Sequence, residues 1–228
     1  MKRFISFILA ITAITAASAQ NYDYKPRESW PFLLEHFTAG QVRTPGGNVL
    51  QEGMYNISVV DGKLHFINAG KIMAADMRQV QIVRIEDDIY VNRLGKMMKC
   101  IWEENGGKYL LLYTEVNMDK LAKTDIGYGI SSATASSQKL NGLFGSQINV
   151  DLSTAIAQSL DGPVLPLTKT YCFLFGAREV PCEKNEFLAL PGIDKAQAKA
   201  FLKEEKIKWH EPESLVKVLR YIVENTNL

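Results

Sequence analysis

The first half of the chain alternates apolar and polar residues in short runs, and turn signals separate these runs. In GMYNISVVDGKLHFIN, Asp61-Gly62 is a favoured two-residue hairpin turn, because both central positions of that turn need positive φ. Counting outward from the turn sets Ile57 opposite Phe66 and Ser58 opposite His65. The apolar residues then share one face, which predicts a half-buried hairpin: Tyr55, Ile57, Val59, Leu64 and Phe66.

Further turn signals continue this pattern: Ala69-Gly70, Asp87-Asp88 and Asn105-Gly106-Gly107. The first turn would set Met73 opposite Phe66, and the second would set Ile85 opposite Tyr90. Turns at such short spacing favour an antiparallel sheet that curls into a roll, sandwich or barrel.

The second half changes in composition and then in periodicity. The Ser-, Gly- and Ala-rich stretch TDIGYGISSATASSQKLNGLFGSQIN has no helical or strand period, which predicts a flexible loop. VDLSTAIAQSL suits a short helix or a strand, and LTKTYCFLF suits a strand. Near the end, Asp194 can cap one helix and Pro212 can begin another. That last helix carries an apolar stripe typical of core packing: Leu215, Leu219 and Ile222.

The predicted fold class is therefore α+β: an antiparallel β-meander that curls into a roll or barrel-like sheet, with two C-terminal α-helices. The expected segments are a signal peptide (1–19), a β-rich region (20–123), a flexible loop (124–149), returning strands (150–190) and a helical pair (191–228).

The N-terminal segment predicts export. Lys2 and Arg3 precede an apolar run that ends in Ala17-Ser18-Ala19, the small-residue pattern of a cleavage site. The apolar run is shorter than the roughly 20 residues that span a bilayer, which argues against a membrane anchor. The mature protein is expected to begin at Gln20, to be periplasmic or secreted, and to have no membrane span after cleavage.

Charge narrows the classes of partner. The chain has 26 Lys and Arg against 25 Asp and Glu, with no basic block. This balance argues against nucleic acid as a partner. The partner is unknown from sequence, and another envelope protein is a candidate.

Cys172 and Cys182 flank a predicted turn in YCFLFGAREVPCEK. Two cysteines in an exported protein usually form a disulfide where geometry allows, so a Cys172–Cys182 bond is predicted, with Cys100 as a buried free thiol. A hairpin register that points the two side chains to opposite faces would forbid the bond.

The sequence carries no signature of catalysis, of a cofactor or of a metal. His36, His65 and His210 stand apart without metal-ligand spacing, so they are interpreted as unrelated surface or edge residues. The acids Glu86-Asp87-Asp88 and Glu103-Glu104 are interpreted as turn formers and solvated charges. We predict no catalytic, cofactor-binding or metal-binding residues. Among the aromatic residues near the mature N-terminus, Trp30 and Phe32 are expected to be buried.

Four stretches of the chain carry a resemblance: WPFLLEHFTAGQV, GKLHFI, IYVN and the C-terminal FLKEEKIKWHEPESLVKVLRYI. Together they resemble a group of small, uncharacterised secreted or periplasmic proteins of Bacteroidota-type bacteria. That group has no established activity, so the resemblance implies no functional residues.

The leading functional hypothesis is a secreted or periplasmic non-enzymatic protein that acts through binding or envelope assembly. One alternative is a small-ligand carrier with a β-barrel-like cavity. Another is an enzyme of an unrecognised type. A cavity lined by apolar and polar groups would favour the carrier, and a buried titratable pair in a cleft would favour the enzyme.

Overall fold

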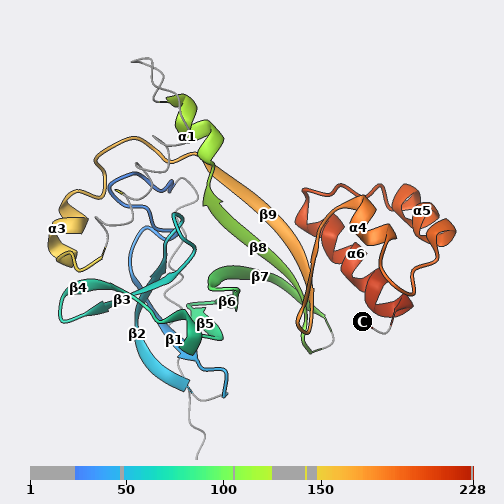
Figure 1. Ribbon diagram of the computed structural model, residues 1–228, viewed down its shortest axis with the longest axis horizontal. Coiled ribbons are helices and arrows are strands. Elements are labelled where there is room, and N and C mark those ends of the chain that lie inside the picture. The colour runs from blue at the N-terminus through green and yellow to red at the C-terminus, as the bar shows by residue number, and fades with distance from the viewer. Residues whose placement is uncertain (1–23, 47–48, 105, 125–141, 143–147, 227) are drawn as a thin grey trace, which may run out of the picture.

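The computed structural model of the chain describes residues 24–46, 49–104, 106–124, 142, 148–226 and 228. These residues form one antiparallel sheet in the order β10-β9-β8-β7-β6-β5-β1-β2-β3-β4 (Figure 1). The strands are β1 Thr38–Arg43, β2 Val49–Ile57, β3 Leu64–Asn68, β4 Lys71–Ala74, β5 Ile82–Ile85, β6 Asp88–Arg93, β7 Lys96–Glu104, β8 Lys108–Val116, β9 Leu167–Phe175 and β10 Arg178–Pro181. The predicted β-meander is confirmed.

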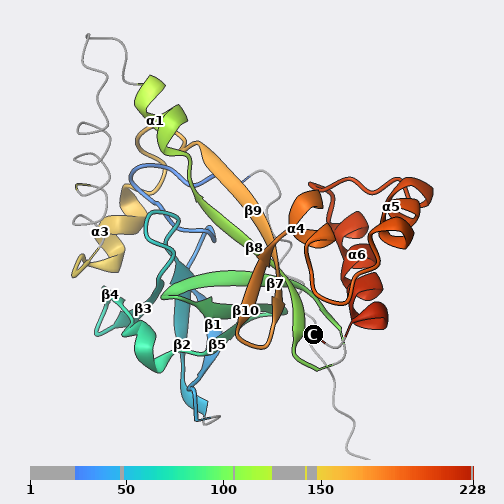
Figure 2. The same cartoon turned by 45° about the vertical axis from the view of Figure 1, so that its right-hand side comes forward.

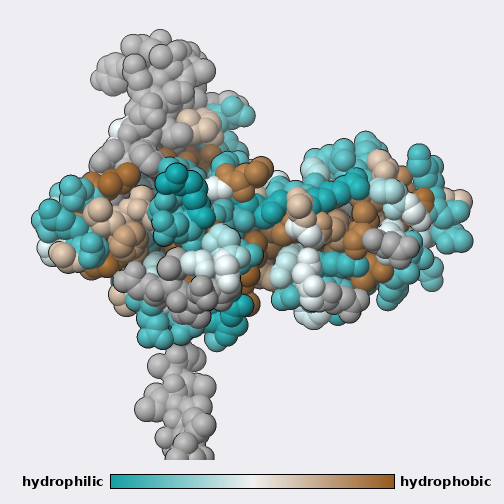
Figure 3. All heavy atoms as spheres, turned by 60° about the horizontal axis from the view of Figure 1, so that its bottom comes forward, coloured by the Kyte–Doolittle hydropathy of each residue, from teal (hydrophilic) through white to brown (hydrophobic). Residues whose placement is uncertain are grey.

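The described helices are short except near the C-terminus: α1 Met118–Thr124, α3 Leu152–Ala157, α4 Lys184–Leu188, α5 Lys195–Glu204 and α6 Pro212–Asn225, with a 3₁₀ turn at Met77–Gln79. Two C-terminal helices, α5 and α6, are therefore confirmed, and the short α4 precedes them. Figures 1 and 2 show α4, α5 and α6 grouped beside the β8–β10 end of the sheet, away from β1–β4. In the space-filling view this helical part forms its own lobe, on which hydrophobic and hydrophilic side chains alternate (Figure 3).

The first hairpin has the predicted faces but not the predicted register. Ile57 lies opposite Leu64 and Asn56 lies opposite His65, two positions away from the expected pairing. The turn is wider than two residues because its side chains bond to the turn backbone. Ser58 Oγ accepts from the Val60 N–H, and Asp61 Oδ1 accepts from the Lys63 N–H. A shift of two keeps every side chain on its face, so the apolar face survives.

Two of the later turns match the predicted pairing, and a third is shifted. Phe66 lies opposite Met73, as predicted, and β7 and β8 pair across residues 105–107, also as predicted. The β5–β6 turn begins earlier than expected, because Glu86 takes a positive φ of 53° and Ile85 pairs with Asp88. Tyr90 consequently lies opposite Val83, on the same face as Ile85.

We call the face that Tyr90, Lys99 and Thr114 share the inner face of the sheet. Lys99 of β7 lies opposite both Tyr90 of β6 and Leu112 of β8, and β8 pairs in turn with β9, so the inner face continues across these four strands. The sheet curls because the β2–β3 turn meets strands far along the chain. The Met97 N–H donates to the Gly62 carbonyl at 2.7 Å, and the Val116 N–H donates to the Val59 carbonyl at 3.0 Å. The result is the curled half-barrel visible in Figure 2.

Helix α6 covers one end of the inner face. Its apolar stripe is fully buried, as predicted for core packing, and packs with Leu110 and Phe173 of the sheet. The members of the stripe are Leu215, Val218, Leu219 and Ile222. Asp194 caps α5 by accepting from the Ala196 and Gln197 N–H groups.

The predicted Cys172–Cys182 disulfide is absent, and both cysteines are buried free thiols. The reason is register. Cys172 lies opposite Pro181, whereas the Cys182 N–H donates to the Tyr171 carbonyl one residue away. Cys172 therefore packs on the outer face, with its Sγ 3.8 Å from Met98 Sδ, and Cys182 packs on the inner face under the helices. Cys100 is also free, but it is half-buried rather than fully buried.

The segment before β1 closes the other end of the half-barrel. Trp30 and Phe32 are buried, as predicted, and their rings meet edge to face at 5.1 Å. The Leu33 N–H donates to the Ile57 carbonyl, which ties this irregular segment to β2.

Residues 1–19 and nearly all of 124–149 lie outside the described residues, so the signal peptide and the flexible loop stay predictions. Within the part of the chain that is described, no helix has the length and apolar character needed to cross a membrane.

Candidate functional site: a cavity on the inner face

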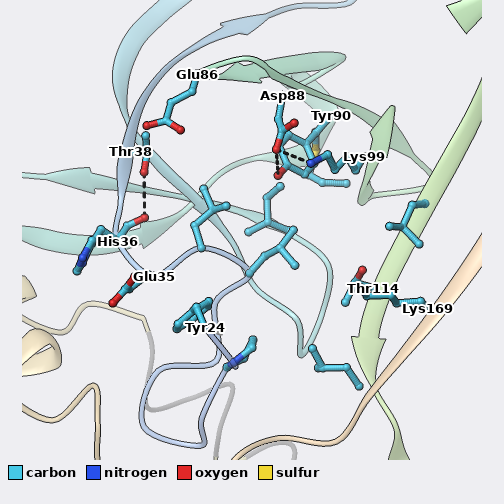
Figure 4. Close-up of a pocket in the computed structure, with 17 residues that line it drawn as sticks. Tyr24, Glu35, His36, Thr38, Glu86, Asp88, Tyr90, Lys99, Thr114 and Lys169 are labelled. Carbon is cyan, nitrogen blue, oxygen red and sulfur yellow. Dashed lines mark hydrogen bonds and ion pairs between the residues drawn. The ribbon is translucent and has the colours of Figure 1, made fainter. Parts of the chain in front are cut away.

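A cavity of about 410 Å³ lies between the inner face and the segment before β1. Figure 4 shows side chains that surround it: Tyr24, Glu35, His36, Thr38, Glu86, Asp88, Tyr90, Lys99, Thr114 and Lys169. The strand residues that line the cavity all lie on the inner face or in the turns beside it, because alternate residues of β6, β7, β8 and β9 point to this side.

Part of the lining is apolar. Six aliphatic residues contribute to it: Leu33, Leu34, Ile57, Met97, Leu112 and Leu167. Ile57 and Met97 are buried in the sheet core, whereas Leu112 is only half-buried. The sheet thus offers an apolar surface that none of the described helices covers at this end.

One side of the cavity carries a close ion pair. Lys99 Nζ lies 2.6 Å from Asp88 Oδ2, and the two side chains retain 29% and 21% of their exposure. The Tyr90 hydroxyl donates to the same carboxylate oxygen at 3.4 Å. Burial, followed by the charge of Asp88, raises the pKa of Tyr90, so this phenol stays protonated and remains a donor. The arrangement presents a cation, an anion and a hydroxyl at one place.

The facing side comes from β8 and β9. Thr114 and Lys169 lie directly opposite each other in the ladder, and Figure 4 shows them together, across from Asp88 and Lys99. Lys169 is exposed and makes no ion pair within the described residues. The cavity therefore has a basic group on each of two sides.

The N-terminal segment supplies the third side. The Tyr24 hydroxyl donates to the Phe32 carbonyl at 2.8 Å, which fixes the ring. Burial, and then the nearby charge of Glu35, raises the pKa of Tyr24. Glu35 and His36 are exposed at the rim.

The histidines do not gather. His36 lines the cavity rim and His210 is exposed just before α6. His65 is buried, with 1% of its surface exposed and its ring 5.4 Å from that of Phe32, so the interpretation of it as a surface or edge residue is wrong. Burial lowers the pKa of His65 below its ordinary value near 6.5. The described residues contain no group of three His, Cys, Asp or Glu side chains that could hold a metal ion.

The sequence interpretation missed Asp88. Its sequence context predicts a turn former and solvated charge, yet Asp88 begins β6 and faces the cavity. A signal was present, because Asp88 and Tyr90 are two residues apart and therefore share a face of any strand. Glu104 lies elsewhere, where it accepts from Trp102 Nε1 at 2.9 Å and pairs with Arg220 at 3.2 Å.

Comparison with known proteins identifies no relative: no family model, curated protein or solved structure matches the chain.

Proposed function

We propose that this protein is a non-enzymatic binding protein that holds a small amphipathic molecule in the inner-face cavity. The observation that carries the proposal is the cavity itself, with an aliphatic lining and a few charged and hydroxyl groups at its sides. Its volume falls within the roughly 300–1,000 Å³ of typical small-molecule sites, which combine the same kinds of lining.

The lining suggests how such a ligand lies. An apolar body would rest against Ile57, Met97 and Leu112, which offer only aliphatic surface. A polar end would reach the Asp88–Lys99 pair, whose ammonium and carboxylate can donate to and accept from one group. Lys169 faces this pair from the other side and would favour an acceptor or an anionic group.

Binding is favoured over catalysis because Asp88 and Lys99 already satisfy each other at 2.6 Å. A general acid or base needs a proton that it can exchange with a substrate. A paired carboxylate and ammonium are better suited to orienting a polar group.

We also propose that the protein binds this ligand outside the cytoplasm, because residues 1–19 have the pattern of an export signal. Protein from the envelope fraction or medium should begin at Gln20. An intact mass that still includes Lys2 and Arg3 would contradict export by this route.

A thermal-shift screen of small carboxylates, amines and uncharged amphiphiles tests the binding proposal. A ligand at 100 times its Kd should add about 2.7 kcal/mol to the free energy of unfolding and raise Tm by several degrees. Leu112→Trp and Thr114→Phe each put an aromatic ring into the cavity and should abolish the shift.

Leu160→Trp is the matched control, because Leu160 is 80% exposed and lies outside the cavity lining. It should keep the full shift. A hit whose shift is the same in all three variants would bind elsewhere, and a screen without hits would contradict the proposal.

A further inference from the structure

A second hollow lies on the helical part, formed by α4, α5 and the residues between α5 and α6. Its volume is about 190 Å³. Three lysines surround three apolar side chains there: Lys184, Lys199, Lys203, Leu202, Ile207 and Trp209. We call this hollow the lysine groove.

The lysines of the groove have no acidic partner among the residues that the structure describes. Lys199 and Lys203 are four residues apart on α5, so their ammonium groups lie on the same side of the helix and repel each other. Lys184 of α4 adds a third positive charge. All three are exposed, and none of them forms an ion pair with any residue that the structure describes.

Other lysines of the same region do pair. Lys208 lies 2.7 Å from Glu211, and Lys217 lies 2.7 Å from Glu205. Acidic side chains are therefore available in this part of the molecule, but none of the described ones forms an ion pair with a groove lysine. The groove concentrates positive charge in a chain whose net charge is only +1.

The floor of the groove is apolar and incompletely covered. Leu202, Ile207 and Trp209 are each half-buried. The Trp209 ring packs on Phe187 at 6.0 Å, which holds it in place. Its indole N–H donates no hydrogen bond within the described chain, so an incoming acceptor can use it.

We propose that the lysine groove binds an acidic segment of a partner protein, which seats one apolar or aromatic side chain on Trp209. Charge complementarity selects the acidic segment, because three ammonium groups without an ion-pair partner in the described chain surround the floor. The small volume suits a single side chain rather than a whole small-molecule ligand. This inference stands apart from the proposed cavity function, because the two sites share no residue.

An anionic membrane is the competing occupant, and the surface of α5 argues against it. A helix that lies in a membrane interface exposes large apolar residues for insertion. The exposed large hydrophobic residues of the described chain all lie outside α5: Met54, Leu94, Trp102, Ile156, Leu160 and Val164.

The test uses a fluorescein-labelled peptide, Glu-Asp-Glu-Phe-Glu-Asp-Glu, and the full chain in a fluorescence anisotropy titration. Saturable one-to-one binding is expected, weakened by added salt and weakened at least tenfold when serine replaces the phenylalanine. The double variant Lys199→Glu/Lys203→Glu should lose at least tenfold in affinity. The milder Lys199→Gln/Lys203→Gln should lose less and should keep the wild-type circular dichroism spectrum.

The charge-matched control is Lys71→Glu/Lys120→Glu, which alters exposed lysines on β4 and α1. It should bind the peptide as the wild type does. No saturable peptide binding, or an equal loss in both double variants, would overturn the proposal. Vesicles of phosphatidylglycerol that bind in a Lys199/Lys203-dependent way, when the peptide does not bind, would overturn it in favour of a membrane surface.

Discussion

The inner face of β8 and β9 has two halves that differ sharply. In the half covered by α6, Leu110 and Phe173 have no exposed surface. Two residues further along β8, Leu112 is half-buried, and four residues from Phe173 along β9, Lys169 is exposed. One strand pair and one face thus provide both a filled core and a cavity wall. The element that covers each half makes the difference.

The covering elements differ in regularity. Helix α6 has 14 residues and presents a continuous apolar stripe, so it can fill the space above the sheet. The segment before β1 is irregular, and its contacts with β2 include the Leu33–Ile57 backbone hydrogen bond. It buries Trp30 and Phe32 but exposes Glu35 and His36, so its apolar side chains do not form one continuous stripe. The cavity therefore lies where this irregular segment does not fill the space above the inner face of the sheet.

The largest expected effect comes from truncating both halves in the same way. Leu219→Ala should lower the free energy of unfolding by about 3 kcal/mol, because it leaves a void in a fully buried stripe. Leu112→Ala should cost about 1 kcal/mol or less, because its side chain already borders open space. Urea denaturation of both variants measures the difference. Equal losses would show that the two halves are packed alike.

A smaller effect should follow pH. Because burial holds the folded-state pKa of His65 below 6.5, the unfolded chain binds a proton first as pH falls. The stability from a neutral His65 is fully present above pH 6.5, and it should decline from there down to the lowered folded-state pKa. The urea midpoint of the wild type should fall over this window, and the part of that fall due to His65 should vanish in His65→Gln. The same pH dependence in that variant would assign the effect to other groups.

The smallest effect concerns the cysteines. Because no bond joins Cys172 to Cys182, dithiothreitol should leave the unfolding midpoint unchanged, whereas loss of a disulfide typically costs about 2–5 kcal/mol. Burial raises the pKa of Cys172 to about 12, so this thiol should resist iodoacetamide at pH 8 until the protein unfolds. Recovery of a peptide that links Cys172 to Cys182 from unreduced protein would contradict this register.

The sequence predicted local features well and long-range ones poorly. Alternation identified the apolar face of the first hairpin, and helical period identified the stripe on α6. The hairpin register failed by two positions because Ser58 and Asp61 bond to the turn backbone. Such bonds depend on local geometry that propensity does not encode.

The cavity could not be predicted from the sequence, for a different reason. It joins Tyr24, Asp88 and Lys169, which come together only after the sheet curls and the N-terminal segment crosses it. The cysteine prediction failed similarly: proximity along the hairpin was correct, but one position of register sends the two thiols to opposite faces.

A titration with the uncharged fluorophore N-phenyl-1-naphthylamine tests the central claim most directly, since an uncharged probe has little attraction to the lysine groove. The account predicts saturable one-to-one binding by the wild type, a loss of at least tenfold in Leu112→Trp, and unchanged affinity in Leu160→Trp and in Lys199→Glu/Lys203→Glu. Absence of saturable binding, or equal affinity in the wild type and Leu112→Trp, would contradict a ligand-binding cavity on the inner face.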